Sequence, residues 1–411
     1  MKRVVITGMG VISPLGNDID TFWNHLVEGK SGITAIDTFD VHDMKTKIAG
    51  LVRDFDPEER LGTKEARRLD RFSQFALAAA EEALNHAQIE LNKIDLERFG
   101  VYVGSGIGGI QTLIENVYTL EQRGPGRVSP SLVPMMITNA AAAQISIKYG
   151  ALGPSLSPVT ACSIGNTAIG EAFHTIRNDD ADIMIAGGSE AAVTRISLAS
   201  FGNVKAISTR NENPTAASRP FDESRDGFVM SEGAGILVLE SLEHAIKRNA
   251  PIYAEVIGYG ASSDAYNMVA SHPEGRGALT AMKKALAKAA LSTDEIDVIS
   301  AHATSTGVGD ISETLAIKQL FGERAYQIPI TANKSMLGHM LGAAGGVEAI
   351  ALVKSLETGV IPPTINLEKP DSECDLDYVS DGARKTTLNI GLSNSFGFGG
   401  HNSAIVLKKY I

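Results

Sequence analysis

Val4-Val5-Ile6-Thr7-Gly8-Met9-Gly10, near the start of the chain, is an apolar run rich in β-branched residues that ends in Gly-x-Gly. Such a run predicts a buried core strand, because β-branched side chains pack well on a pleated surface. A similar run, Glu255-Val256-Ile257-Gly258-Tyr259-Gly260, lies far down the chain. The echo indicates an internal duplication with a join near residues 245–252. We therefore expect two halves, residues 1–250 and residues 251–411.

Strand-like runs alternate with helix-like runs along the rest of the chain. The Ala-rich segments Phe72–Ala87 and Ala278–Ala290 have helical periodicity. The alternation indicates an α/β architecture, and 411 residues exceed the ~250–300 residues that one hydrophobic core can serve. The other runs that predict strands are Gly100–Val103, Ile183–Ala186, Gly235–Leu239, Val298–Ala301 and Ile405–Leu407.

The composition excludes several classes of protein. A net charge of −11 disfavours nucleic acid as a partner, because phosphate neutralisation needs a basic surface. No stretch reaches the ~18 consecutive apolar residues that span a bilayer, and the first residues lack the apolar core of a signal peptide. The two cysteines form no C-x-x-C pair, which predicts neither a disulfide framework nor a zinc site. We expect a cytoplasmic protein that holds no metal and inserts in no membrane.

The two cysteines differ in their surroundings. Cys374 is flanked by Glu373 and Asp375, whose negative charges disfavour a thiolate. Cys162 follows an apolar run that predicts a strand and precedes Thr167–Ile176, which has helical periodicity. A cysteine at the first turn of a helix has a lowered pKa, and the free N–H groups there can hold an oxyanion. A small buried core cysteine would have the same local pattern, so the alternatives stay open on this evidence.

Two of the nine histidines stand apart from those in helical patterns. His302 follows the strand-like run Val298–Ala301, so it lies at the carboxyl edge of a strand, where α/β sites form. His339 stands between Gly338 and Gly342, which allow close packing of backbone or ligand. Either histidine alone is more often structural. Together with Cys162 they supply the thiol and the imidazoles that thioester acyl transfer requires.

One motif imitates a nucleotide site. Gly104-Ser105-Gly106-Ile107-Gly108-Gly109 fits G-x-G-x-x-G directly after a strand. A dinucleotide site also needs an acidic residue ~20 positions further on, at the end of a second strand. The segment at that distance, Glu121 to Gly126, is a loop by composition. We therefore do not interpret the motif as a nucleotide site.

Four basic residues repeat at helical spacing. Lys64, Arg67, Arg68 and Arg71 fall at i, i+3, i+4 and i+7 of a helix expected to begin near Thr63. Positive charge at a helix start opposes the helix dipole, so the arrangement costs the helix some stability. This cost favours a docking face for an acidic partner over a face that is merely solvated.

Several motifs together resemble one known family. The chain is similar over its whole length to the β-ketoacyl-acyl carrier protein synthases of the thiolase-like superfamily, most closely to the synthase II type of bacterial type II fatty acid synthesis. The resemblance implies a five-layer αβαβα sandwich and a homodimer. The motifs are Thr160-Ala161-Cys162, Arg225-Asp226-Gly227-Phe228-Val229-Met230, His302-Ala303-Thr304-Ser305-Thr306 and Lys334-Ser335-Met336-Leu337-Gly338-His339.

The resemblance implies a decarboxylative Claisen condensation between malonyl-acyl carrier protein and a fatty acyl chain, which grows by two carbons. Cys162 would carry the acyl chain as a thiolate favoured by the helix end, and the N–H groups of Cys162 and Phe398 would form the oxyanion hole. His302 and His339, both neutral, would donate hydrogen bonds to the malonyl thioester oxygen. Lys334 would support them. It is expected to pair with Glu348.

The same resemblance implies binding residues. Phe398 would also act as a gate, Thr304 and Thr306 would contact the pantetheine arm, and no cofactor is required beyond the 4′-phosphopantetheine of the carrier protein. Ile107 and Phe201 would line the acyl pocket, with Ile107 reaching it across the dimer interface. Acidic acyl carrier protein would dock on Lys64, Arg67, Arg68, Arg71 and Lys205.

Asn267 and Val269 depart from the family, which more often has His and Thr there. A polar contact to the pantetheine arm or the gating loop is expected to be lost.

Two other functions are alternatives to the condensing enzyme. A papain-like hydrolase is suggested because His302 follows Cys162 by about 140 positions, although the C-G-S-C-W signature is missing. A non-catalytic partner subunit of a polyketide synthase would keep the fold but lack the nucleophile, which Cys162 supplies here.

Overall fold

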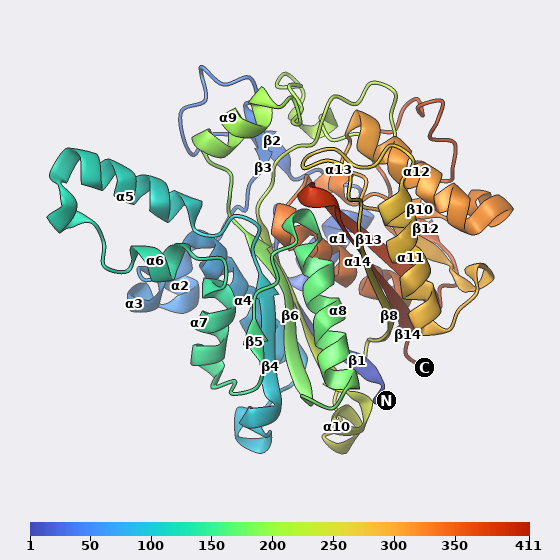
Figure 1. Ribbon diagram of the computed structural model, residues 1–411, viewed down its shortest axis with the longest axis horizontal. Coiled ribbons are helices and arrows are strands. Elements are labelled where there is room, and N and C mark those ends of the chain that lie inside the picture. The colour runs from blue at the N-terminus through green and yellow to red at the C-terminus, as the bar shows by residue number, and fades with distance from the viewer.

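The computed structural model describes residues 1–411 and contains two five-stranded sheets of identical topology (Figure 1). In each sheet the first three strands are antiparallel, and the last three are joined by parallel pairs. The first sheet runs in the order β1 (Val4–Ile12), β7 (Gly233–Ser241), β6 (Ile183–Glu190), β4 (Phe99–Gly104), β5 (Ser155–Leu156). The second runs in the order β8 (Ala254–Ser263), β14 (His401–Lys409), β13 (Ile390–Gly397), β9 (Val298–Ser300), β10 (Ile330–Thr331). The repeated order confirms the internal duplication.

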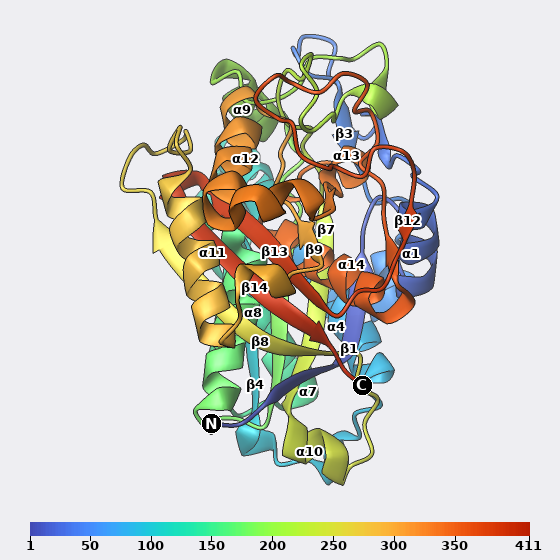
Figure 2. The same ribbon diagram turned by 90° about the vertical axis from the view of Figure 1, so that its right-hand side faces the viewer.

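The first strands of the two sheets meet each other. β1 and β8 pair at only three positions, Val4 to Ile6 against Val256 to Ala254. This short contact joins the sheets into one continuous ladder of ten strands. Figure 2 shows β1 and β8 crossing at this point, close to both chain termini.

Helices complete the five expected layers. The outer helices of the first half cover one face, those of the second half cover the other, and two helices lie buried between the sheets (Figure 1). The middle pair is buried over most of its surface, because it packs against a sheet on each face. In order from one side to the other, the helices are α4 (Arg71–His86) and α7 (Ala140–Tyr149), α8 (Ile164–Arg177) and α14 (Ala344–Thr358), α11 (Arg276–Ala289) and α12 (Gly307–Phe321).

The repeated Gly-x-Gly has one physical cause in both halves. A Cβ atom on Gly10 of β1 would lie 2.0 Å from the Ala79 carbonyl oxygen of α4. A Cβ atom on Gly260 of β8 would lie 2.1 Å from the Ala281 carbonyl oxygen of α11. Each strand therefore needs glycine because an Ala-rich helix rests directly on its backbone. The same strand–helix packing in both halves explains why the Gly-x-Gly pattern occurs in both β1 and β8.

The predicted basic helix face is wrong. Helix α3 (Thr63–Ala66) ends before Arg67, and the Asp70 side chain caps the separate helix α4 by accepting the Phe72 N–H. The chain turns between them because a capping aspartate satisfies the free N–H groups of a new helix. The four basic residues therefore share no helix face, and Arg71 forms an ion pair with buried Glu232 at 2.9 Å.

The remaining elements surround the sheets, and no helix is long and apolar enough to cross a membrane. They are α1 (Ile19–Val27), β2 (Ile33–Ala35), β3 (Ile48–Gly50), α2 (Pro57–Leu61), α5 (Ile110–Arg123), α6 (Leu132–Met136), α9 (Arg195–Asn203), α10 (Leu242–Lys247), α13 (Lys334–Leu337), β11 (Val360–Ile361) and β12 (Arg384–Lys385).

Candidate active site

A cavity of about 640 Å³ lies where the carboxyl ends of β4, β6, β9 and β13 converge. Parallel strands present their following loops at one edge, so segments from both halves meet there. Cys162, His302 and His339 all line this cavity. The fold thus brings together a thiol from the first half and two imidazoles from the second.

Cys162 sits in a tight 3₁₀ turn, Ala161–Ser163, that leads directly into α8. Residues 157–160 form no strand, which differs from the expected strand over the apolar run before the cysteine. Ala161 has φ +51°, a left-handed conformation that costs a non-glycine residue energy. Two backbone N–H groups, those of Phe398 and of Cys162 itself, point to the sulfur. This sharp turn aims the thiol at paired donors.

The resting state of the thiol differs from the expectation. Burial raises the pKa of Cys162 to about 11, although the charge of Lys334 and the two N–H groups lower it. The side chain is buried in an apolar cluster with Leu341 and Phe228, where an anion loses its hydration. The helix end therefore does not by itself keep Cys162 as a thiolate at neutral pH. The N–H groups instead lie ready for charge that develops during a reaction.

Alkylation tests this state of the thiol. The rate at which iodoacetamide modifies Cys162 is expected to climb from about pH 7 to about pH 10, because only the thiolate reacts. Peptide mapping by mass spectrometry separates Cys162 from Cys374, the other free cysteine. A rate that levels off below about pH 8 would contradict the prediction, since it would reveal a thiolate at rest.

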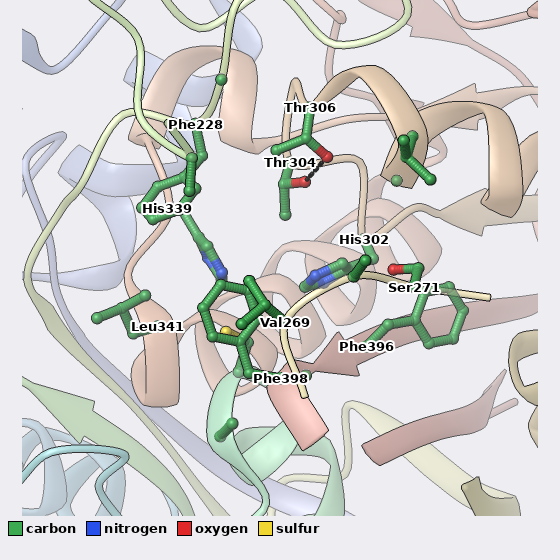
Figure 3. A pocket seen from close by; sticks show the side chains of 18 of the residues that line it. Phe228, Val269, Ser271, His302, Thr304, Thr306, His339, Leu341, Phe396 and Phe398 are labelled. Carbon is green, nitrogen blue, oxygen red and sulfur yellow. Dashed lines mark hydrogen bonds between the residues drawn. The ribbon is translucent and has the colours of Figure 1, made fainter. Parts of the chain in front are cut away.

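The two histidines form a neutral pair. Their ring centroids lie 5.4 Å apart with planes nearly perpendicular, and Figure 3 shows both rings directed toward Phe398 from different sides. Burial, with the nearby charge of Lys334, holds the pKa of His302 and that of His339 well below the ordinary value. Both rings are therefore uncharged at neutral pH, and each has a single N–H to donate.

Lys334 organises the histidine side of the cavity. Its Nζ donates to Glu348 Oε1 at 2.5 Å and lies 3.5 Å from His302 Nδ1. A cation beside Nδ1 favours the tautomer that carries its proton on Nε2. Burial raises the pKa of Glu348 to about 7, an effect that Lys334 opposes. The backbone of His339 is held separately, because its main-chain N–H donates to the Val229 carbonyl at 2.7 Å.

Aromatic and hydroxyl side chains line the rest of the cavity. Phe201 and Phe398 have ring centroids 6.1 Å apart, and Thr304 Oγ1 and Thr306 Oγ1 share a hydrogen bond of 3.0 Å (Figure 3). Ile107 also lines the cavity, within its own chain. Its reach into a pocket across a dimer interface stays a prediction.

The segment with the two unusual residues touches the Phe398 loop. Gly399 N–H donates to the Met268 carbonyl at 2.7 Å. Asn267 Oδ1 accepts the N–H groups of Val269 and Ala270 at 2.8 and 3.0 Å, so this side chain caps its own turn. Asn267 therefore stabilises the segment locally.

The expected docking residues do not all line one hollow. Lys205 is exposed and lines the active-site cavity, whereas Lys64 and Arg68 line a separate hollow of about 580 Å³. None of these three has an acidic partner within salt-bridge distance. Arg67 pairs with Glu58 at 3.1 Å, and Arg71 pairs with Glu232. Only the first three are therefore free to meet an acidic partner.

The loop that imitates a nucleotide fingerprint is occupied by the protein itself. Glu190, at the end of β6, accepts the N–H groups of Gly106 and Ile107 at 2.9 and 3.2 Å. A carboxylate thus fills the position that a phosphate would need. The sequence analysis did not identify Glu190, because an isolated glutamate at a strand end carries no motif.

No group of three or more His, Cys, Asp or Glu side chains could hold a metal ion.

Family models match most of the chain. Residues 1–245 match the N-terminal domain of β-ketoacyl synthases, and residues 253–368 match their C-terminal domain. A 3-oxoacyl-[acyl-carrier-protein] synthase 2 from Synechocystis sp. is 48% identical over 409 residues, covering 100% of this chain and 98% of the relative. Another of that name, from Staphylococcus aureus strain COL, is also 48% identical over 409 residues, with coverage of 100% and 99%.

Solved structures give the same result. A type II polyketide ketosynthase in complex with its acyl carrier protein superposes with a TM-score of 0.93 at 37% identity, covering 100% of both chains. A β-ketoacyl synthase from Burkholderia phymatum superposes with a TM-score of 0.92 at 34% identity, again over 100% of both chains.

Proposed function

This chain belongs to the β-ketoacyl synthase family, and we propose a role in its reaction for each residue of the cavity. The reaction condenses a malonyl group on acyl carrier protein with a fatty acyl thioester, losing CO₂ and lengthening the acyl chain by two carbons in fatty acid biosynthesis. The observation that carries the assignment of roles is one cavity that joins a thiol facing two N–H donors with two neutral imidazoles.

In the first half-reaction, Cys162 accepts the acyl chain. Its sulfur attacks the thioester carbonyl of acyl-carrier protein, a C–S bond forms, and the thiol of the phosphopantetheine arm leaves with the proton. The N–H groups of Cys162 and Phe398 stabilise the tetrahedral oxyanion. Their direction toward the sulfur supports this role, since an acyl oxygen on that sulfur would lie within their reach.

In the second half-reaction, His302 and His339 stabilise the enolate. The Nε2–H groups donate to the malonyl thioester oxygen as CO₂ departs. The resulting carbon nucleophile attacks the acyl carbonyl, a C–C bond forms, the C–S bond to Cys162 breaks, and the released thiolate of Cys162 takes up a proton. A neutral imidazole with its proton on Nε2 can donate this hydrogen bond. Each donor to an oxyanion commonly lowers the activation barrier by ~2.7–4 kcal/mol. Lys334, paired with Glu348, fixes the His302 tautomer. Thr304 and Thr306 contact the pantetheine arm.

Turnover of the purified protein tests the function. With acyl-carrier protein and malonyl-carrier protein, mass spectrometry should find a product two carbons longer and an acyl group on Cys162 before malonyl is added. Release of free fatty acid without malonyl would instead indicate a hydrolase. No acylation and no product would indicate a non-catalytic partner subunit.

Acyl carrier protein docks, in this proposal, on the three unpaired basic residues Lys64, Arg68 and Lys205. Lys64→Glu and Lys205→Glu are each expected to raise the KM for carrier-protein substrates about tenfold with little change in kcat, because electrostatic complementarity governs encounter. Lys247→Glu, an exposed lysine on α10, is the control and should leave KM unchanged. Equal effects at all three positions would indicate only a general response to net charge.

A homodimer is proposed from one apolar surface. Tyr118, Val133 and Ile147, on α5, α6 and α7, are 58%, 58% and 75% exposed, next to the edge strand β5. Figure 1 shows α5 projecting from the body of the molecule on that side. Exposed apolar side chains beside an unpaired strand edge suit a second copy of the chain.

Substitution at this surface tests the dimer. Val133→Asp should shift the protein from dimer to monomer in sedimentation velocity, because a charge would be buried at the interface. Ile246→Asp, on α10 and 56% exposed, is the matched control and should stay dimeric. A wild-type protein that sediments as a monomer would overturn the proposal.

The join between the halves is proposed at residues 250 and 251. Helix α10 ends at Lys247 and β8 begins at Ala254, so a cut between them interrupts no element. Co-expressed fragments divided there should assemble into active enzyme, because their contacts are retained. Fragments that never associate would contradict this boundary.

We also place the protein in the cytoplasm. Cys162 and Cys374 are both free, which fits a reducing compartment. Recovery of the protein from a membrane or extracellular fraction of its source cells would contradict this location.

A further inference from the structure

Glu190 is a buried carboxylate that the proposed mechanism does not use. Its side chain is 0% exposed and has no lysine, arginine or histidine within salt-bridge distance. It accepts four hydrogen bonds from uncharged donors: Ser105 Oγ at 2.7 Å, Gly106 N at 2.9 Å, Ile107 N at 3.2 Å and Gly342 N at 3.1 Å. A buried acceptor with four donors fixes all of them, because each donor would otherwise be unsatisfied.

These donors belong to two segments far apart in the sequence. Three come from the loop after β4, and Gly342 comes from the turn that leads into α14. The segments are in close contact, since a Cβ atom on Gly342 would lie 2.8 Å from Gly106 N. Ser105 Oγ also accepts the Gly108 N–H at 2.9 Å, which closes the loop around the carboxylate. Glu190 therefore ties a loop of the first half to a turn of the second.

Each of the two segments that donate hydrogen bonds to Glu190 contributes one apolar residue to the wall of the cavity. Ile107 follows Gly106, and Leu341 precedes Gly342; both line the cavity and pack in the apolar cluster that contains Cys162. Leu341 is visible beside the histidines in Figure 3. His339 does not depend on this tie, because its backbone N–H donates to the Val229 carbonyl and its backbone carbonyl accepts the Ser231 N–H at 2.9 Å.

We propose, resting on the function proposed above, that Glu190 is a positioning residue which holds Ile107 and Leu341 in place and so sets the chain-length discrimination of acyl loading. A rigid apolar wall can discriminate between chains that differ by a methylene by about 10–200-fold. A wall free to shift admits neighbouring lengths more equally. Loosening the tie should therefore affect the acyl half-reaction and leave the histidine half-reaction largely intact.

The charge of Glu190 supplies a second readout. Burial raises the pKa of Glu190 and its four donors oppose this rise. Its negative charge is also one of the influences that raise the pKa of the neighbouring Cys162 thiol. Replacing the carboxylate by an amide should therefore move the pH midpoint of Cys162 alkylation downward, which a purely structural defect would not do.

The experiment compares Glu190→Gln with Glu82→Gln in the full-length enzyme. Glu82 is a matched control, because it is a largely buried carboxylate that accepts two backbone N–H groups, those of Val11 and Ile19, away from the cavity. Acylation of Cys162 is followed by mass spectrometry over a series of saturated acyl-carrier proteins, together with malonyl decarboxylation. In Glu190→Gln, the kcat/KM ratio between the preferred chain and one four carbons longer or shorter should contract about tenfold. Decarboxylation should change less than about twofold.

Each outcome decides one question. A chain-length profile in Glu190→Gln parallel to the wild type, or equal losses in loading and decarboxylation, would overturn the inference. A wild-type enzyme that never acylates Cys162 would instead overturn the proposed function. If Glu190→Gln does not fold, Ser105→Ala removes one of the four donors and should contract the ratio in the same direction by a smaller factor. A parallel profile in Ser105→Ala would then overturn the inference.

Discussion

Cys162→Ala is expected to abolish acyl-enzyme formation and to lower the rate of condensation by at least about 10⁴-fold, as with other covalent nucleophiles. Without the sulfur, no atom in the cavity can hold the acyl chain between the two half-reactions. Both imidazoles remain, so malonyl decarboxylation should persist in the variant. The measurements are intact-mass detection of the acyl-enzyme and the rate of CO₂ release.

Cys374→Ala is the matched control for this substitution. Cys374 is also a buried free cysteine whose pKa burial raises to about 11, but it lies near Thr314 and Tyr378, outside the cavity. Condensation should therefore be retained in Cys374→Ala. Acyl transfer from carrier protein to Cys162→Ala, at a rate near that of the wild type, would show that another residue is the nucleophile.

His302→Ala and His339→Ala are each expected to lower malonyl decarboxylation by about 10²–10³-fold, the usual effect of losing one oxyanion donor. Acyl loading should fall much less, because in our proposal the N–H groups of Cys162 and Phe398 stabilise the oxyanion of that step. The two rates are measured separately, decarboxylation by CO₂ release and loading by acyl-enzyme mass in single turnover.

His86→Ala controls for the loss of a buried histidine. Its Nδ1 accepts the Met9 N–H at 3.3 Å on the far side of β1, and burial lowers its pKa as well. This variant should lose stability without separating the two half-reactions. Equal losses of loading and decarboxylation in His302→Ala and His339→Ala would refute the division of roles between thiol and imidazoles.

Much of the architecture was predictable, because the preference for a strand or a helix depends on short runs of residues. Most of the apolar runs that predict strands lie in strands, since β-branched residues favour a pleated surface wherever they occur. The run directly before Cys162 is the exception, because it forms no strand. β13 was missed, because Asn394, Ser395 and two glycines make it polar in composition although most of it is buried. Its partners on both sides cover it, and no local pattern reports that.

The residues of the candidate site were predictable from the sequence. The pKa of its thiol and the ion pairs of the nearby basic residues were not. Cys162, His302 and His339 are identified by motifs, and the fold brings them to one cavity. The pKa of the thiol was predicted in the wrong direction, because the helix end is a local feature whereas desolvation depends on distant neighbours. The predicted basic helix face was wrong for a similar reason. Asp70 caps a separate helix, and Arg71 pairs with Glu232, which is far away in the sequence.

The sequence by itself determined most of the strands, the duplication and the identity of the reactive side chains, because each follows from short runs of residues. Only the tertiary structure decided their charge, their partners and the wall of the cavity. Glu190 illustrates the difference: its four donors come from segments about 85 and 150 residues away in the chain. Burial and hydrogen bonding are properties of what surrounds a side chain, and folding alone supplies those surroundings.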